Sequence, residues 1–285
     1  MFCKFFLHDL RAGLTDHKGR LLMAFFLFFC LSSYHFLTLR IYELTNPEFF
    51  QNPVTTGDYF LALIGGCGKV EQLPEGGTTF VMPVMWMVFV LWMQFVSLYY
   101  PFVDLNGIGK HLLCLSGQKS VWWLSKCLWA VCNALANYLV AFLATVVAGI
   151  CLGATPSMEA NVYLYQELEM NREFLTSETT WNTVPLFFLL ALVLVALTLL
   201  QLVLSVAIKP LFSYLLMAGF LFAGSYMQSP ALFGNFEMPA RSSLLVTTGL
   251  SPVSGGLLCL WVIAGSVMFG WVLFDRKDIL EGDGI

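Results

Sequence analysis

Two long uncharged runs constrain the fold of this chain more than any other feature of the sequence. Phe80 to Val103 carries no charged residue over about 24 positions, and Cys127 to Leu152 carries none over about 26. A helix needs roughly 20 residues to cross the hydrocarbon core of a bilayer. The two runs therefore predict two transmembrane helices.

The overall composition extends this interpretation to the whole chain. Of the 285 residues, 58% are hydrophobic and only 11% are charged, whereas a soluble domain carries about 25% charged residues. No polar stretch is long enough to form a soluble domain of its own. We expect an all-α integral membrane protein with a single transmembrane domain over 1–285 and six spans, at approximately 21–39, 80–103, 122–152, 183–208, 211–227 and 257–274.

The distribution of Lys and Arg predicts the orientation of these spans, because cytoplasmic loops carry an excess of both residues. If the N-terminus is inside, ten cations lie in inner segments and four in outer segments. Both termini are then cytoplasmic. The inner cations are Lys4, Arg11, Lys18, Arg20, Lys110, Lys119, Lys126, Lys209, Arg276 and Lys277, and the outer ones are Arg40, Lys69, Arg172 and Arg241.

The segment between the two uncharged runs has the pattern of a short helix bounded by breakers. Asn106-Gly107 favours the end of the preceding span. Lys110 to Ser116 is long enough for about two helical turns. Gly117 is typical of a helix C-terminus, and Ser120 is a suitable cap for the next helix. The sequence therefore predicts a span, a short cytoplasmic helix, a sharp turn and another span.

Aromatic residues mark two further places near the predicted cytoplasmic face. Trp122 and Trp123 stand where interfacial aromatic belts are expected. Within Met1 to Arg20, Phe and Leu residues recur at helical spacing opposite charged residues. This pattern predicts an amphipathic helix on the membrane surface.

The predicted external segments are more irregular. Arg40 to Thr79 is rich in Gly and Pro, and we expect only a short interfacial turn at Tyr59 to Ile64. Ser157 to Leu175 has the pattern of an acidic amphipathic helix. Glu237 and Arg241 are four residues apart, a spacing that favours an ion pair.

Polar side chains inside the spans are candidates either for helix–helix hydrogen bonds or for substrate contact. They are Gln94, Asn133, Asn137 and Gln201. No Asp or Glu lies inside a predicted span, which disfavours proton- or sodium-coupled transport. No catalytic, metal-binding or phosphate-loop motif is present, so we expect no cofactor or metal on this chain.

The segment before the third predicted span also resembles the coupling region of ABC-2 exporter permeases. That family carries E-x-G-x-x-x-x-L-L-x-x-P-x-S followed by a Lys. The residues here that match this pattern are Gly109, Leu112, Leu113, Leu115, Ser116, Ser120 and Lys126. The glutamate of the family is absent, and Gly117 stands near where its proline is common.

The resemblance implies an N-terminal elbow helix, six spans and external re-entrant helices, here near Pro239 to Thr248. It also implies a partner ABC ATP-binding subunit that holds ATP and Mg, a second permease chain, and a plasma-membrane location without nucleic acid. The contact with the ATPase would fall on Gly109, Lys110, Leu112, Leu113, Leu115, Ser116 and Gly117. The family's range and the acidic outer segments suggest a hydrophobic or cationic peptide as the substrate, while export of a lipid-linked glycan or a small drug stays open. The polar residues Gln94, Asn133, Asn137 and Gln201 are the candidate substrate path. An intramembrane enzyme, or a sensor or immunity component, is the alternative.

Overall fold

The structure, a computed structural model, describes residues 2–15, 18–45, 52–70, 78, 80–161, 180–246 and 248–276. Long helices dominate these residues. They are α1 (Phe2–Leu10), α2 (Lys18–Thr45), α3 (Thr56–Ile64), α4 (Val84–Leu98), α5 (Tyr100–Asn106), α6 (Ile108–Ser116), α7 (Lys119–Cys151), α9 (Val184–Ile208), α10 (Pro210–Tyr226) and α11 (Pro252–Arg276). Shorter pieces are the π-helical turn η1 (Arg11–Thr15), the 3₁₀ turns η3 (Phe233–Glu237) and η4 (Pro239–Arg241), and the antiparallel strands β1 (Glu159–Asn161) and β2 (Thr180–Asn182).

Four helical stretches in the described residues are long and apolar enough to cross a membrane. They are Val84–Asn106, Lys119–Cys151, Val184–Ile208 and Pro252–Arg276, and α10 is a shorter apolar helix. Much of α11 presents apolar side chains to the outside, including Trp261 and Met268. Such a surface is suited to lipid, which supports a bilayer environment. Every range predicted as a span contains a helix.

The range predicted at 80–103 is divided into two helices. Helix α4 ends at Leu98, and α5 begins at Tyr100 with Pro101 in its first turn. Proline has no backbone N–H to continue the helical hydrogen bonds, so the helix is interrupted just before it. The break at Tyr99 leaves α5 and α6 as a separate helical pair.

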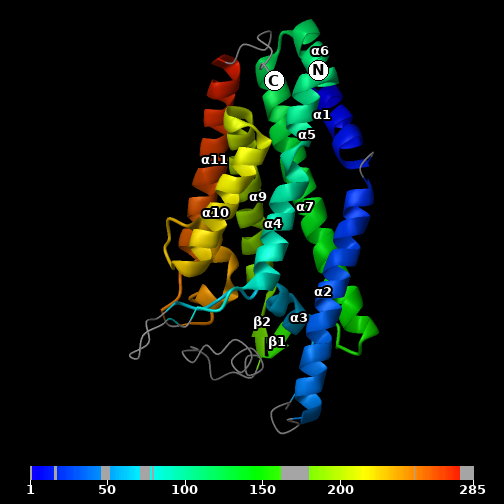
Figure 1. Ribbon diagram of the computed structural model, residues 1–285, viewed down its shortest axis with the longest axis vertical. Helices are drawn as coiled ribbons and strands as arrows, with labels where there is room; N and C mark the ends of the chain where they lie inside the picture. The colour runs from blue at the N-terminus through cyan, green and yellow to red at the C-terminus, as the bar shows by residue number, and fades with distance from the viewer. Residues whose placement is uncertain are drawn as a thin grey trace.

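The helices form one elongated bundle around α9, which packs against α4, α7, α10 and α11 (Figure 1). Helix α2 runs along α7, where Ser32 Oγ and Thr145 Oγ1 lie 3.0 Å apart. Helices α1 and α6 and the last turns of α11 lie at one end of the bundle. Helix α3 and the strands lie at the other (Figure 1).

The buried apolar residues form two clusters. The larger one fills the bundle between α4, α7, α9 and η3. The smaller one lies at the α6 end, where Phe5, Leu113, Trp122, Trp129 and Phe274 pack together. This second cluster brings the N-terminal helix, the α6 region and the end of α11 into one unit.

The prediction of a mere turn at Tyr59–Ile64 is wrong, because these residues belong to the buried helix α3. Thr55 and Asp58 form a reciprocal capping box at its start. Asp58 also accepts hydrogen bonds from the backbone and side chain of Asn161, at 2.6 and 2.8 Å. These bonds join α3 to β1, and local Gly and Pro content concealed the helix.

The acidic helix predicted over Ser157–Leu175 is contradicted at its start. Glu159–Asn161 is the strand β1, which pairs antiparallel with β2. Glu159–Asn161 forms a strand because it hydrogen-bonds to Thr180–Asn182. That segment lies too far along the chain for a local sequence pattern to reveal the pairing. The rest of the predicted helix falls in 162–179, outside the described residues.

The turn between α9 and α10 is very tight, as the Lys209-Pro210 pair suggests. Lys209 is the only non-glycine residue with positive φ among those described, at 75°. After α10 the chain forms η3, which packs against α9, α10 and α11, and η4, which contacts η3 and whose Arg241 donates to carbonyls at the end of α10. This segment is therefore part of the core at the end opposite α6.

Candidate functional site

Helix α6 is defined by glycines at both of its ends. Gly117 ends the helix in the left-handed conformation at φ 65°, and its N–H donates to Leu113 O at 2.8 Å. Gly109 lies against Asp104 of α5, and a Cβ at this position would be 2.1 Å from Asp104 Oδ2. Gly109 therefore permits a close approach that any larger residue would prevent.

The two faces of α6 have different environments. Leu113 is 2% exposed and belongs to the protein's own core, and Leu112 is partly buried against it. Leu115 is 86% exposed, and Ile108 is 64% exposed on the same side of the helix. The sequence grouped the leucines together, but only Leu115 among them is available to another molecule. Lys110 and Ser116 are of intermediate exposure.

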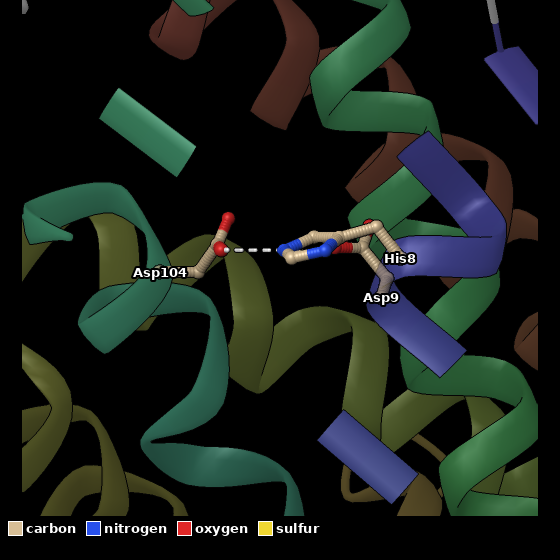
Figure 2. A group of neighbouring side chains, drawn as sticks. All are labelled: His8, Asp9 and Asp104. Atoms are coloured by element: carbon tan, nitrogen blue, oxygen red, sulfur yellow. Dashed lines mark ion pairs between the residues drawn. The ribbon is translucent and has the colours of Figure 1, made fainter. Parts of the chain in front are cut away.

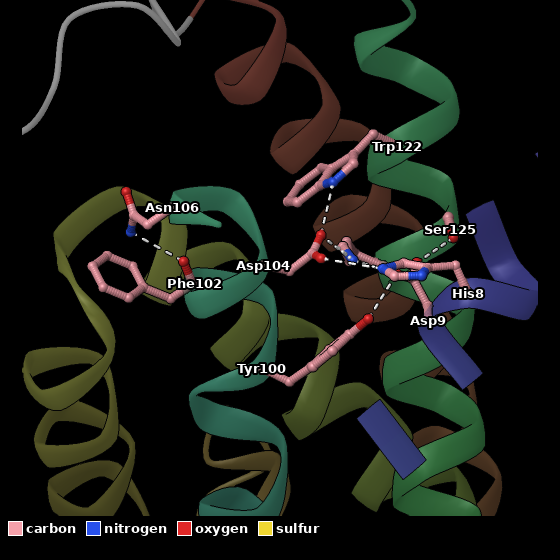
Figure 3. Close-up of polar contacts among 9 residues, drawn as sticks. His8, Asp9, Tyr100, Phe102, Asp104, Asn106, Trp122 and Ser125 are labelled. Carbon is pink, nitrogen blue, oxygen red and sulfur yellow. Dashed lines mark hydrogen bonds and ion pairs between the residues drawn. The ribbon is translucent and has the colours of Figure 1, made fainter. Parts of the chain in front are cut away.

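Beneath α6, a buried lysine joins three helices. Lys126 of α7 is fully buried, and its Nζ lies 2.6 Å from Asp104 Oδ2 of α5. Figure 3 shows the labelled neighbours of this pair, with Trp122 directed at Asp104 and Tyr100 directed at Asp9. Lys126 also forms a short ion pair with Asp9 of α1. Lys126, which the sequence places among the cations of the inner segments, is thus not exposed there, because the docking of α1 and α5 encloses it.

Hydrogen bonds complete this ion cluster, which we define as Asp9, Asp104 and Lys126. Tyr100 Oη donates to Asp9 Oδ1 at 2.9 Å, and Ser125 Oγ donates to Asp9 Oδ2. Trp122 Nε1 donates to Asp104 Oδ2 at 3.2 Å. The ammonium also lies over the Tyr100 and Trp122 rings, 4.7 and 5.0 Å from their centroids.

The ion cluster contains two carboxylates and one ammonium. The charge of the two carboxylates is therefore offset mainly by Lys126. His8 Nε2 lies 3.7 Å from Asp104 Oδ1 at the edge of the group (Figure 2). His8, Asp9 and Asp104 are of residue types that bind metal ions and lie close together. In the structure, however, the Lys126 ammonium lies within bonding distance of both carboxylates. The arrangement is suited to holding helices together.

Two local predictions beside the ion cluster are wrong. Ser120 does not cap α7, which begins at Lys119 after Gln118, with no side-chain cap hydrogen bond. The tight turn at Gly117 starts the helix one residue before Ser120. Trp122 and Trp123 do not form an exposed interfacial belt, because both are buried and stack on Phe274 of α11 at 4.6 and 6.2 Å between ring centroids.

The structure brings the polar residues of the spans to the interfaces of α4 with α7 and α9. Gln201 Nε2 donates to Gln94 O at 3.2 Å. Asn133 Nδ2 lies 3.3 Å from Val96 O, and Asn137 Nδ2 donates to Asn133 O at 2.9 Å. We call Gln94, Asn133, Asn137 and Gln201 the amide group. All four are buried.

Several atoms of the amide group have no hydrogen-bond partner in the described part of the chain. They are both side-chain polar atoms of Gln94, Asn137 Oδ1 and Gln201 Oε1. Buried polar atoms are normally paired with protein groups or water. The amide group therefore retains hydrogen-bonding capacity in the middle of the bundle.

The predicted Glu237–Arg241 ion pair does not form. Arg241 is buried and donates to the carbonyls of Cys67, Gly68 and Ser225, at 2.9, 3.2 and 2.6 Å. It also donates to Gly224 O at the end of α10 and to the side chain of Asn235. The i,i+4 argument requires a continuous helix, whereas Pro239 lies in a second 3₁₀ turn between the two residues.

Sequence reasoning missed the ion cluster because its members come from three helices distant along the chain. The only local signal was a lysine at the boundary of an uncharged run, one residue after Ser125. Comparison with models of known protein families, with curated proteins and with solved structures finds no match.

Proposed function

We propose that this chain is the membrane-spanning permease subunit of an ATP-driven exporter of the ABC-2 type, with α6 as its coupling helix. The observation that carries the proposal is the division of α6 into two faces. Leu113 fixes the helix to its own bundle, while Leu115 and Ile108 remain exposed at the bundle end. A short rigid helix with an exposed apolar face is suited to bind a separate protein.

The ion cluster supports a mechanical role for α6. Asp104 lies against Gly109 of α6. It also pairs with Lys126 of α7, and Lys126 in turn pairs with Asp9 of α1. A displacement of α6 is therefore resisted by α1 and α7 together. Such a connection would pass movement of a docked ATPase to the long helices.

The proposed membrane arrangement has six spans with both termini cytoplasmic. It adds α2 and α10 to the four helical stretches that are long and apolar enough to cross. Helix α10 has 17 residues, which gives a length of about 25 Å at 1.5 Å per residue. This is slightly shorter than the hydrocarbon core, and a locally thinned bilayer accommodates such a difference at modest cost.

The proposed partners follow from what the sequence contains. It has no ATP-binding motif, so a separate ABC subunit would bind ATP and Mg, and a second permease chain would complete the exporter. The plasma membrane is the proposed location. The amide group is the proposed substrate path, because its unpartnered atoms offer hydrogen bonds to a peptide-like molecule.

The test compares two leucines of α6 that differ in exposure. The full chain is co-expressed with each ABC ATPase subunit found among the genes that neighbour its own, and copurification and ATP hydrolysis are measured. Leu115→Ala should leave thermal stability unchanged and weaken ATPase binding by about 10- to 100-fold, because an anchoring Leu contributes roughly 1.5–3 kcal/mol.

Leu113→Ala provides the matched control. Removing this buried side chain should lower the free energy of unfolding by about 2–5 kcal/mol. Retention of full ATPase binding by Leu115→Ala would contradict the docking role. The absence of any associating ATPase would favour the enzyme, sensor or immunity alternatives.

A further inference from the structure

Glu237 is a fully buried carboxyl group in the core of the protein. It lies in η3, outside the long helices, and is 0% exposed. Neither of its side-chain oxygens has a hydrogen-bond partner among the described residues. This arrangement is unusual, because buried carboxylates are normally paired with a cation or with several donors.

Within the part of the chain that the structure describes, the groups around Glu237 provide no compensating positive charge. Tyr138 of α7 and Cys259 of α11 are its titratable neighbours. The Tyr138 hydroxyl already donates to Phe187 O at 3.0 Å. Helix α9 has no titratable residue. Those of α10 are Tyr214, which donates to Leu91 O, and Tyr226, which is 49% exposed.

Arg241 is the nearest cation along the chain, but its guanidinium is directed elsewhere. All three of its nitrogens donate to backbone carbonyls or to the side chains of Asn235 and Cys67. The carbonyls of Gly224 and Ser225 lie at the C-terminal end of α10, where the helix dipole favours a positive charge. Arg241 is thus stabilised without Glu237.

An ionised carboxylate in this environment would be costly, and a buried acid without a partner takes up a proton instead. Burial accordingly raises the pKa of Glu237 well above its ordinary value. In the neutral form the carboxyl no longer requires a counter-charge. The apolar residues of η3, α9 and α11 can then pack around it.

We propose that Glu237 is a proton-binding site, occupied while η3 is packed in the bundle and vacated when this end of the bundle opens to water. The packed form then holds one proton more than the open form. Above pH 4.5, the ordinary pKa of Glu, a rise in pH therefore favours opening, by up to tenfold per pH unit for one proton. This inference does not depend on the exporter assignment.

Cys259 provides a natural reporter of the opening. Its thiol is 0% exposed and neighbours Glu237, so a thiol reagent reaches it only when this region opens. Cys114 on α6 is exposed and gives a reference rate in the same molecule. When closing is faster than labelling, the labelling rate of Cys259 follows the open population.

The experiment measures labelling of the full chain in lipid nanodiscs with N-ethylmaleimide, by peptide mass spectrometry, from pH 6 to 9. Glu237→Gln keeps the shape of the neutral acid but does not titrate, and Glu159→Gln on an exposed strand residue is the control. The wild-type rate divided by the Glu237→Gln rate should rise with pH, because the ionisation of the thiol cancels in this ratio. A ratio that stays constant across the range overturns the proposal.

A second measurement needs no variant. With carbon-13 in the glutamate carboxyl groups, the infrared carbonyl band of a protonated glutamic acid is separated from any aspartic acid band. The folded wild type should show this band at pH 7.5, where ordinary glutamates are ionised, and lose it on unfolding. Its absence from the folded protein means that Glu237 is ionised and excludes a bound proton.

Discussion

Replacing Lys126 with Met should destabilise the protein more than replacing either of its carboxylate partners with the neutral amide. Lys126 is fully buried and contacts both Asp9 and Asp104. Lys126→Met leaves two carboxylates facing each other without a cation. Removing one partner of a buried ion pair typically costs about 3–5 kcal/mol.

Asp104→Asn has a different electrostatic result. Lys126 keeps its pair with Asp9, so one positive charge then matches one negative charge. The amide can still accept a hydrogen bond from Trp122 Nε1. We therefore expect a smaller cost of about 1.5–3 kcal/mol, the contribution of a hydrogen bond to a charged group.

The assay is thermal unfolding of the full chain in nanodiscs, monitored by the fluorescence of the tryptophans around the ion cluster. Lys126→Met should lower Tm by roughly 6–20 °C, at 2–4 °C for each kcal/mol. Lys110→Met on α6 is the control, with an expected effect within about 0.5 kcal/mol. If Asp104→Asn is as damaging as Lys126→Met, the charge-balance argument is wrong.

Three further substitutions test the packing at α6, α10 and the amide group. Gly109→Ala should lower Tm, because its Cβ would meet Asp104, whereas Gly219→Ala, with open space around it, should raise stability by up to about 1 kcal/mol through helix propensity. Equal effects of the two changes on Tm would contradict the close approach of α6 to Asp104. Gln94→Leu should raise the free energy of unfolding by about 1–2 kcal/mol, since it removes two unpartnered polar atoms. The proposed substrate path predicts that the same change reduces transport by the reconstituted complex. If transport is unchanged, Gln94 contributes to helix packing and is not part of the substrate path.

Local patterns were sufficient to predict the long helices and the C-terminal end of α6. Uncharged runs indicate where helices can cross a membrane. Gly117 has a positive φ, which glycine adopts readily because it has no Cβ. These features depend on residues close together in the sequence. The same holds for the turn at Lys209.

The features that were missed depend on how distant segments pack. Asp9 forms its ion pair with Lys126 only when α1 is docked on α7. Arg241 donates hydrogen bonds to the carbonyls of α10 only when η4 is packed against the end of that helix. Which leucine of α6 remains exposed likewise depends on the bundle, because Leu113 and Leu115 are equivalent by composition. For α3, the capping box at Thr55 and Asp58 was a usable local signal that the surrounding Gly and Pro residues obscured.

The most direct test of the proposed function is a photo-crosslinking residue placed at position 115 of the chain, which is co-expressed with any ABC ATP-binding subunit that its neighbouring genes encode. The proposal predicts a crosslink to that ATP-binding subunit from position 115, where the native Leu is exposed, and none from lipid-facing position 261. Position 261 is a suitable control because Trp261 is also highly exposed. A crosslink from neither position, or an equal yield from both, would contradict α6 as the coupling helix.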